Sequence, residues 1–218
     1  MAEVKRLQGG RFRGTYFDLL KTDPYRQAVQ FFLDELYGDR DFAQRDLQFA
    51  RIAGALQRIF PKEVVATAVA LAELHALSEK LDFAMAHAWV RMEGLPVRTD
   101  AMRYVTAWRK VANKDSRTRQ LKSVLALGYE LEHMTRTTGL RLMLKMMRRP
   151  ATAAGLGDLQ RFLESGFDTF SNMARKRGVS AEFLRTVEER EATWIARLFD
   201  GDPVACATEL QNTLGQAR

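Results

Sequence analysis

The chain has 218 residues, of which 46% are hydrophobic and 28% charged, a composition that excludes a disordered protein. Its formal net charge of +7 allows an acidic partner, and its single cysteine, Cys206, excludes an internal disulfide and any multi-cysteine metal site. The basic residues 1–14 contain no apolar run typical of a secretory signal. The uncharged stretch 64–72 is too short to span a bilayer, so we expect a cytoplasmic protein without a transmembrane segment.

The first predicted elements are a flexible basic segment over residues 1–22 and a helical hairpin after it. Apolar residues recur at helical spacing from Tyr25 to Leu36. Gly38 suits the left-handed conformation that commonly ends a helix. The next helix has an apolar face between residues 42 and 60, and Asp46 lies on that face. The hairpin is therefore predicted to carry one carboxylate toward the core.

The rest of the chain is predicted to be helical. No segment shows sustained apolar–polar alternation bounded by hairpin turns, so no strand is expected. Helical periodicity appears over residues 61–92, 99–112, 117–136, 139–149, 158–176, 180–200 and 202–214, with Ser180 read as an N-cap. The pattern predicts an all-α fold: a multi-helix bundle of roughly eight or nine helices without a sheet, in which residues 23–218 form a single all-helical domain.

Several ionisable residues fall on the predicted apolar faces. Burial of an unpaired charge is costly, so each of them needs a partner or a wet cavity. Two interpretations remain open: separate ion pairs that connect helices, or side chains that share one pocket. In the pocket, His75 would contact a ligand or carry a proton, and an arginine would hold an anionic group. The candidate ligand-binding residues are Asp46, His75, Asp82, Arg119, Glu132, Arg190 and Glu191.

The sequence lacks the common motifs of catalysis and of metal or cofactor binding. It contains no Gly-x-Ser-x-Gly, no Gly-x-Gly-x-x-Gly and no Gly-x-x-x-x-Gly-Lys motif. Glu130 and His133 have the spacing found in di-iron bundles, but such sites need a second Glu-x-x-His motif, and the sequence has none. We therefore expect no catalytic residue, no metal site and no cofactor.

Positive charge is concentrated between residues 103 and 149, where twelve Lys and Arg residues accompany three Asp and Glu residues. This excess leaves nucleic acid or another anionic surface open as a partner, and an ordinary solvated basic face as the alternative. No recognition-helix motif or aromatic platform supports nucleic acid. The predicted helix 139–149 has basic and apolar faces that suit a membrane surface, a partner groove or core packing.

Six short motifs are spread over much of the chain. They are Phe31–Tyr37 (FFLDELY), Leu77–Asp82 (LSEKLD), Met147–Ala151 (MRRPA), Ala154–Leu156 (AGL), Leu159–Phe167 (LQRFLESGF) and the pair Arg190-Glu191. This set resembles an uncharacterised bacterial family recognised by a "FFLEELY" motif. The present chain has Asp34 where that motif has its first glutamate. The resemblance implies one all-helical bacterial domain and assigns no catalytic residue.

Together these observations favour a non-catalytic protein that binds a partner protein or a small anionic ligand. One alternative is an enzyme or small-ligand sensor with a polar pocket around His75 and Asp82. Another is a binder of nucleic acid or another anionic surface through the basic region 103–149.

Overall fold

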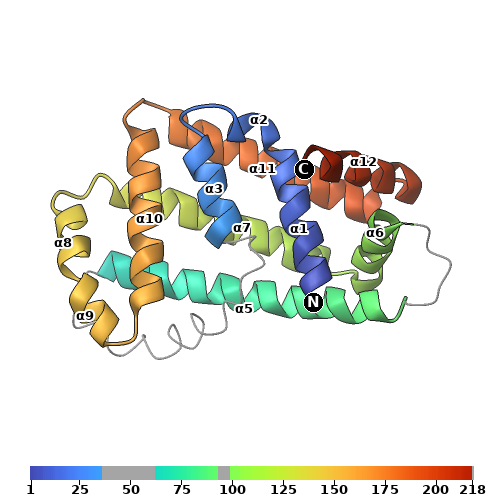
Figure 1. The fold of residues 1–218 in the computed structure, drawn as a ribbon, viewed down its shortest axis with the longest axis horizontal. Coiled ribbons are helices and arrows are strands. Elements are labelled where there is room, and N and C mark those ends of the chain that lie inside the picture. The colour runs from blue at the N-terminus through green and yellow to red at the C-terminus, as the bar shows by residue number, and fades with distance from the viewer. Residues whose placement is uncertain (36–61, 93–98, 218) are drawn as a thin grey trace. The chain divides into compact units, whose positions relative to one another are not determined.

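The computed structural model describes residues 1–35, 62–92 and 99–217 (Figure 1). These described residues form eleven helices, nine of them with seven residues or more, and no strand. The predicted all-α fold is therefore confirmed. The second helix of the predicted hairpin, with Asp46, lies outside the described residues. No helix in the described ranges is long and apolar enough to cross a membrane.

The chain divides into two compact units. Unit 1 comprises residues 1–39, 77–122 and 186–218, and unit 2 comprises residues 40–76 and 123–185. Unit 1 contains α1 (Ala2–Thr15), α2 (Phe17–Leu20), α3 (Arg26–Glu35), α6 (Asp100–Val111) and α12 (Pro203–Gln216). Unit 2 contains α8 (Leu140–Met146), α9 (Arg148–Ala153) and α10 (Gly157–Ala174). Three longer helices have residues in both units: α5 (Lys62–Val90), α7 (Lys114–Met134) and α11 (Val179–Asp200). The single domain over residues 23–218 stays a prediction.

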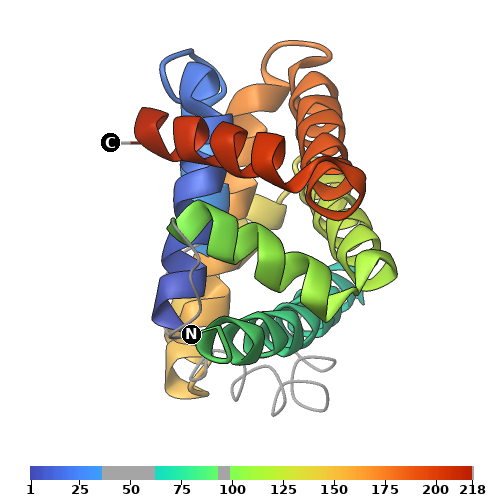
Figure 2. The same ribbon diagram turned by 90° about the vertical axis from the view of Figure 1, so that its right-hand side faces the viewer.

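Helix α1 occupies most of the segment that we expected to be flexible. Val4, Leu7 and Phe12 recur at helical spacing and are fully or almost fully buried in unit 1. The helix packs against α12, which also packs against α6, and Figure 2 shows α12 in red beside both helices. A Cβ atom added to Gly14 would overlap the backbone carbonyl oxygen of Thr213, so this glycine permits the close approach of α1 and α12. Gly14, which suggests flexibility in the sequence, thus serves helix packing.

The core of unit 1 combines large aromatic side chains with small residues of α12. Its members include Trp89, Tyr104, Trp108, Trp194, Leu198, Cys206, Ala207 and Leu210. Two of its helices begin where local signals in the sequence place them. The Thr99 hydroxyl accepts a hydrogen bond from the Met102 amide at the start of α6. Asp202 accepts from two amides at the start of α12, with Pro203 in the first turn.

In unit 2, α8 and α9 pack against α10. Their inward side chains are Leu140, Leu144 and Ala151, and α10 buries residues such as Phe162 and Phe170. Gln160 of α10 joins this contact because its side-chain amide donates a hydrogen bond to the Leu144 carbonyl. Packing and hydrogen bonding therefore fix α10, which leads into the candidate site described below.

Candidate functional site

The candidate residues predicted from the sequence lie in both units. Asp82, Arg119, Arg190 and Glu191 belong to unit 1, and His75 and Glu132 belong to unit 2. His75 is buried, whereas Arg119 is exposed. Arg190 forms an ion pair with Asp18, with Nη1 to Oδ1 and Nη2 to Oδ2 distances of 2.7 Å. Among the described residues of unit 1, Asp82 and Glu191 are the buried carboxylates.

Glu191 forms a buried ion pair with Arg11 of α1. The Arg11 Nη1 and Nη2 atoms donate to the two carboxylate oxygens at 3.0 and 2.7 Å. The Tyr16 hydroxyl donates to Glu191 Oε1 at 3.2 Å, and the Arg11 guanidinium lies 5.6 Å from the centroid of the Trp194 ring. These contacts connect α1 to α11, as the ion-pair interpretation of the sequence describes.

The carboxylate charge of Asp82 in α5 has fewer compensating contacts than that of Glu191. The Asp82 Oδ1 atom accepts a hydrogen bond from Gln8 Nε2 at 3.0 Å and lies 3.9 Å from Arg117 Nη2. Burial raises the pKa of Asp82, and the positive charge of Arg117 and the Gln8 hydrogen bond oppose this rise. The nearby Tyr104 is fully buried, and burial raises its pKa to about 12. Asp82 therefore takes part in a desolvated polar cluster inside unit 1.

The basic region 103–149 is partly neutralised by acidic residues. Within the described parts of the chain, five of its twelve cations form ion pairs: Lys114–Asp200, Arg117–Asp82, Arg136–Glu132, Arg141–Asp168 and Arg148–Glu164. Arg103 donates a hydrogen bond to the backbone carbonyl of Trp89, and Arg109 donates one to that of Leu198. The cations that form one block in the sequence thus contact separate acidic or carbonyl groups in the structure.

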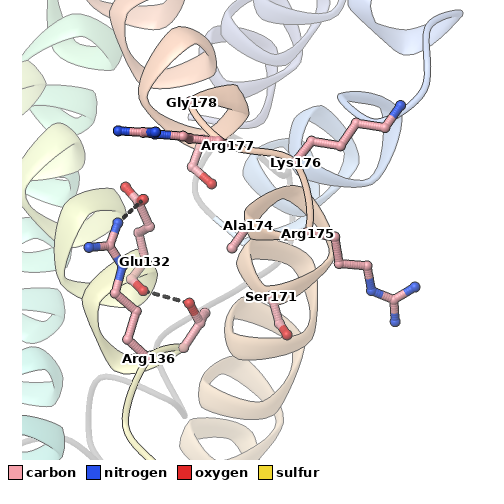
Figure 3. Close-up of a pocket in the computed structure, with 10 residues that line it drawn as sticks. Glu132, Arg136, Ser171, Ala174, Arg175, Lys176, Arg177 and Gly178 are labelled. Atoms are coloured by element: carbon pink, nitrogen blue, oxygen red, sulfur yellow. Dashed lines mark hydrogen bonds and ion pairs between the residues drawn. The ribbon is translucent and has the colours of Figure 1, made fainter.

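A basic cavity of about 550 Å³ lies within unit 2 (Figure 3). Its ten lining residues come from the end of α7, the end of α10, the following turn and the start of α11. Four of them are cationic, namely Arg136, Arg175, Lys176 and Arg177, and Glu132 is the one carboxylate among them. The excess of positive charge makes this cavity suitable for an anion.

The turn between α10 and α11 follows from its sequence. Gly178 has φ +84°, a left-handed conformation that glycine adopts without steric cost, and it separates the basic run 175–177 from α11. The first hydrogen bond of α11 joins the Glu182 amide to the Gly178 carbonyl at 2.9 Å. Amides in the first turn of a helix lack intrahelical partners and carry partial positive charge. Arg177 and the start of α11 therefore provide adjacent donors for an anion.

Ser180 gives independent support for a ligand in this cavity. It is the second residue of α11 rather than the predicted N-cap, and it is only 2% exposed. It lines the cavity, and its Oγ atom has no hydrogen-bond partner among the described residues. A buried hydroxyl without a partner is unfavourable, and an anion in the cavity would accept its hydrogen.

Arg136 and Arg177 are the cations best placed to act together. Figure 3 shows both guanidinium groups on the Glu132 side of the cavity, whereas Arg175 and Lys176 point away from it. Arg136 Nη2 donates to Glu132 Oε1 at 3.0 Å. The two arginines come from different turns, one after α7 and one before α11. The arrangement brings two guanidinium groups from different segments to the same side of the cavity.

Of this cavity, sequence reasoning identified only Glu132 as a site residue. Arg177 and Ser180 carry a local signal, a basic run followed by a glycine and a helix start. That signal also fits an ordinary solvated turn, and the proximity of Arg136 depends on the packing of unit 2. The cavity therefore becomes visible only in the folded structure.

The fold and the cavity describe an all-helical protein with a basic, polar pocket. The chain belongs to the family described as "Domain of unknown function (DUF8198)", whose sequence model matches residues 1–205. No curated protein and no solved structure matches the chain.

Proposed function

We propose that this protein is a non-catalytic binder of a small anionic ligand of the phosphate class, held in the cavity at the start of α11. The buried Ser180 hydroxyl is the observation that carries the proposal, because it lines a basic cavity and has no partner among the described residues. The helix N-terminus and the Arg177 guanidinium supply further donors beside it. The proposal assigns the small anionic ligand expected from the sequence to this cavity.

Titration calorimetry of the full chain with inorganic phosphate tests this proposal. Arg177→Gln is expected to weaken phosphate binding by about tenfold or more, because it removes a charge-assisted hydrogen bond. Ser180→Ala is expected to weaken binding by a smaller factor, because the hydroxyl is a neutral donor.

Lys176→Gln is the matched control, because it removes one positive charge from the same turn while its side chain points away from Glu132. This variant is expected to retain nearly the phosphate affinity of the wild type. Absence of phosphate binding by the wild type, or equal losses in the Lys176 and Arg177 variants, would contradict the proposal.

We also propose that this family is the bacterial one marked by the "FFLEELY" motif, and that the protein is cytoplasmic. The motifs from Phe31 to Glu191 all lie within the matched residues 1–205, which supports the first proposal. An alignment of family members in which most bacterial sequences lack FFLDELY-like residues at 31–37 would contradict it. Cell fractionation with an antibody to the chain tests the location.

A further inference from the structure

We infer that the ligand of this cavity is a condensed phosphate, a small polyanion with two or more linked phosphate groups and no aromatic part that the protein recognises. This inference rests on the function proposed above and narrows its ligand class. The chemistry of the cavity wall is the first observation that supports it. Ala174 is the one apolar side chain among the ten lining residues, and none of the ten is aromatic. Bases are usually held by stacking, and these lining residues offer no aromatic ring on which a base could stack.

The second observation is that the hydrogen-bond donors come from two separate segments of the chain. Arg177, Ser180 and the first turn of α11 form one group, and Arg136 after α7 forms the other. Figure 3 shows Arg136 and Arg177 on the same side of the cavity. One phosphate at the start of α11 engages the first group, and a second, linked phosphate reaches Arg136.

The Glu132 carboxylate competes with an anionic ligand for Arg136. It accepts a hydrogen bond from Arg136 at 3.0 Å and places a negative charge in the cavity. A ligand that contacts Arg136 competes with this carboxylate, so a dense multiple charge gains more there than a single phosphate does. The negative charge of Glu132 also repels the ligand, so loss of this carboxylate is expected to strengthen the contact with Arg136.

Calorimetric titration of the full chain with phosphate, pyrophosphate and ADP tests the inference. Pyrophosphate is expected to bind about tenfold more tightly than phosphate or better, and ADP no more tightly than pyrophosphate. Arg136→Gln should remove most of the preference for pyrophosphate, because it lowers pyrophosphate affinity by a larger factor than phosphate affinity. Its side chain is 72% exposed, so the variant is expected to fold. Glu132→Gln should raise pyrophosphate affinity, a gain that loss of folding cannot imitate.

Arg175→Gln is the matched control, since it makes the same change of charge with a side chain that points away from Glu132. Equal effects of the Arg175 and Arg136 changes would indicate general electrostatic attraction and overturn the inference. Tighter binding of ADP than of pyrophosphate would also overturn it. If phosphate binds in an Arg177-dependent way but pyrophosphate binds no better, the inference fails and the proposed function stands. If neither anion binds, both fail.

Discussion

At the residue scale, two buried carboxylates of unit 1 differ in how their charge is compensated. Glu191 accepts two hydrogen bonds from Arg11 and one from Tyr16, whereas Asp82 accepts one amide hydrogen bond and lies 3.9 Å from Arg117. A buried charge is tolerated when its partner and hydrogen bonds replace water. The two residues should therefore respond differently to substitution and to pH.

We expect Glu191→Gln to lower the free energy of unfolding by about 3 kcal/mol, because Arg11 loses the carboxylate that holds both of its Nη atoms in a buried site. Urea denaturation at neutral pH measures this loss. Asp200→Asn is the control, because the Lys114–Asp200 pair is exposed and its loss should cost less than about 1 kcal/mol. Similar losses in the two variants would contradict the expectation.

The burial of Asp82 predicts how the stability of the protein depends on pH. Burial raises the pKa of Asp82 above its ordinary value of 3.8, so the folded protein holds this proton more tightly than the unfolded chain does. The contribution of protonated Asp82 to stability is therefore fully present below 3.8 and is lost as the pH rises through the raised pKa. We expect the wild type to lose stability relative to Asp82→Asn over this range, by about 1.4 kcal/mol for each pH unit that the range covers.

Urea denaturation of both proteins between acidic and neutral pH measures this difference. The difference in unfolding free energy should grow with pH and then become constant once Asp82 is ionised in the folded state. A difference that stays the same at every pH would contradict the prediction. A difference of opposite slope would mean that Arg117 outweighs desolvation at this site.

At the element scale, helices with strong local signals were predicted closely. The expected helix 61–92 corresponds to α5, and 99–112 corresponds to α6, whose cap at Thr99 is a local feature. The short α1 was not predicted, because its glycines and charges weaken the local signal. What stabilises α1 is its packing against α12, about two hundred residues later in the chain, which local periodicity does not report.

The close contact between α1 and α12 predicts that a larger side chain at Gly14 destabilises the protein. We expect Gly14→Ala to lower the free energy of unfolding by about 2 kcal/mol or more, because the added methyl group would overlap the Thr213 carbonyl and force the helices apart. Gly215→Ala in α12 is the matched control. A Cβ atom there meets no atom within 4 Å, and alanine favours a helix, so this change should be neutral or stabilising. Equal destabilisation by both changes would contradict the packing argument.

At the scale of the whole molecule, the sequence reports how many charges there are but not how they pair. The twelve cations of residues 103–149 form a block in the sequence, yet five of them contact carboxylates in the structure. The same limit explains why the cavity was missed. Arg136 and Arg177 are distant in the sequence and line one cavity only because unit 2 folds around them. Pairing and convergence depend on tertiary packing, which periodicity does not encode.

The pairing of cations with carboxylates in residues 103–149 lowers the expected affinity for nucleic acid, the alternative partner. Binding to duplex DNA releases about 0.9 counterions for each phosphate that a protein neutralises, so the salt dependence of the affinity reports the number of contacts. We expect weak binding to random duplex DNA with a shallow slope, measured by fluorescence anisotropy at increasing salt. Loss of the exposed Arg119 and Lys122 should flatten the slope further, whereas Arg141→Gln, in an ion pair with Asp168, should change it less. A slope typical of about six or more contacts would instead show that the cations act as one surface, despite their carboxylate partners.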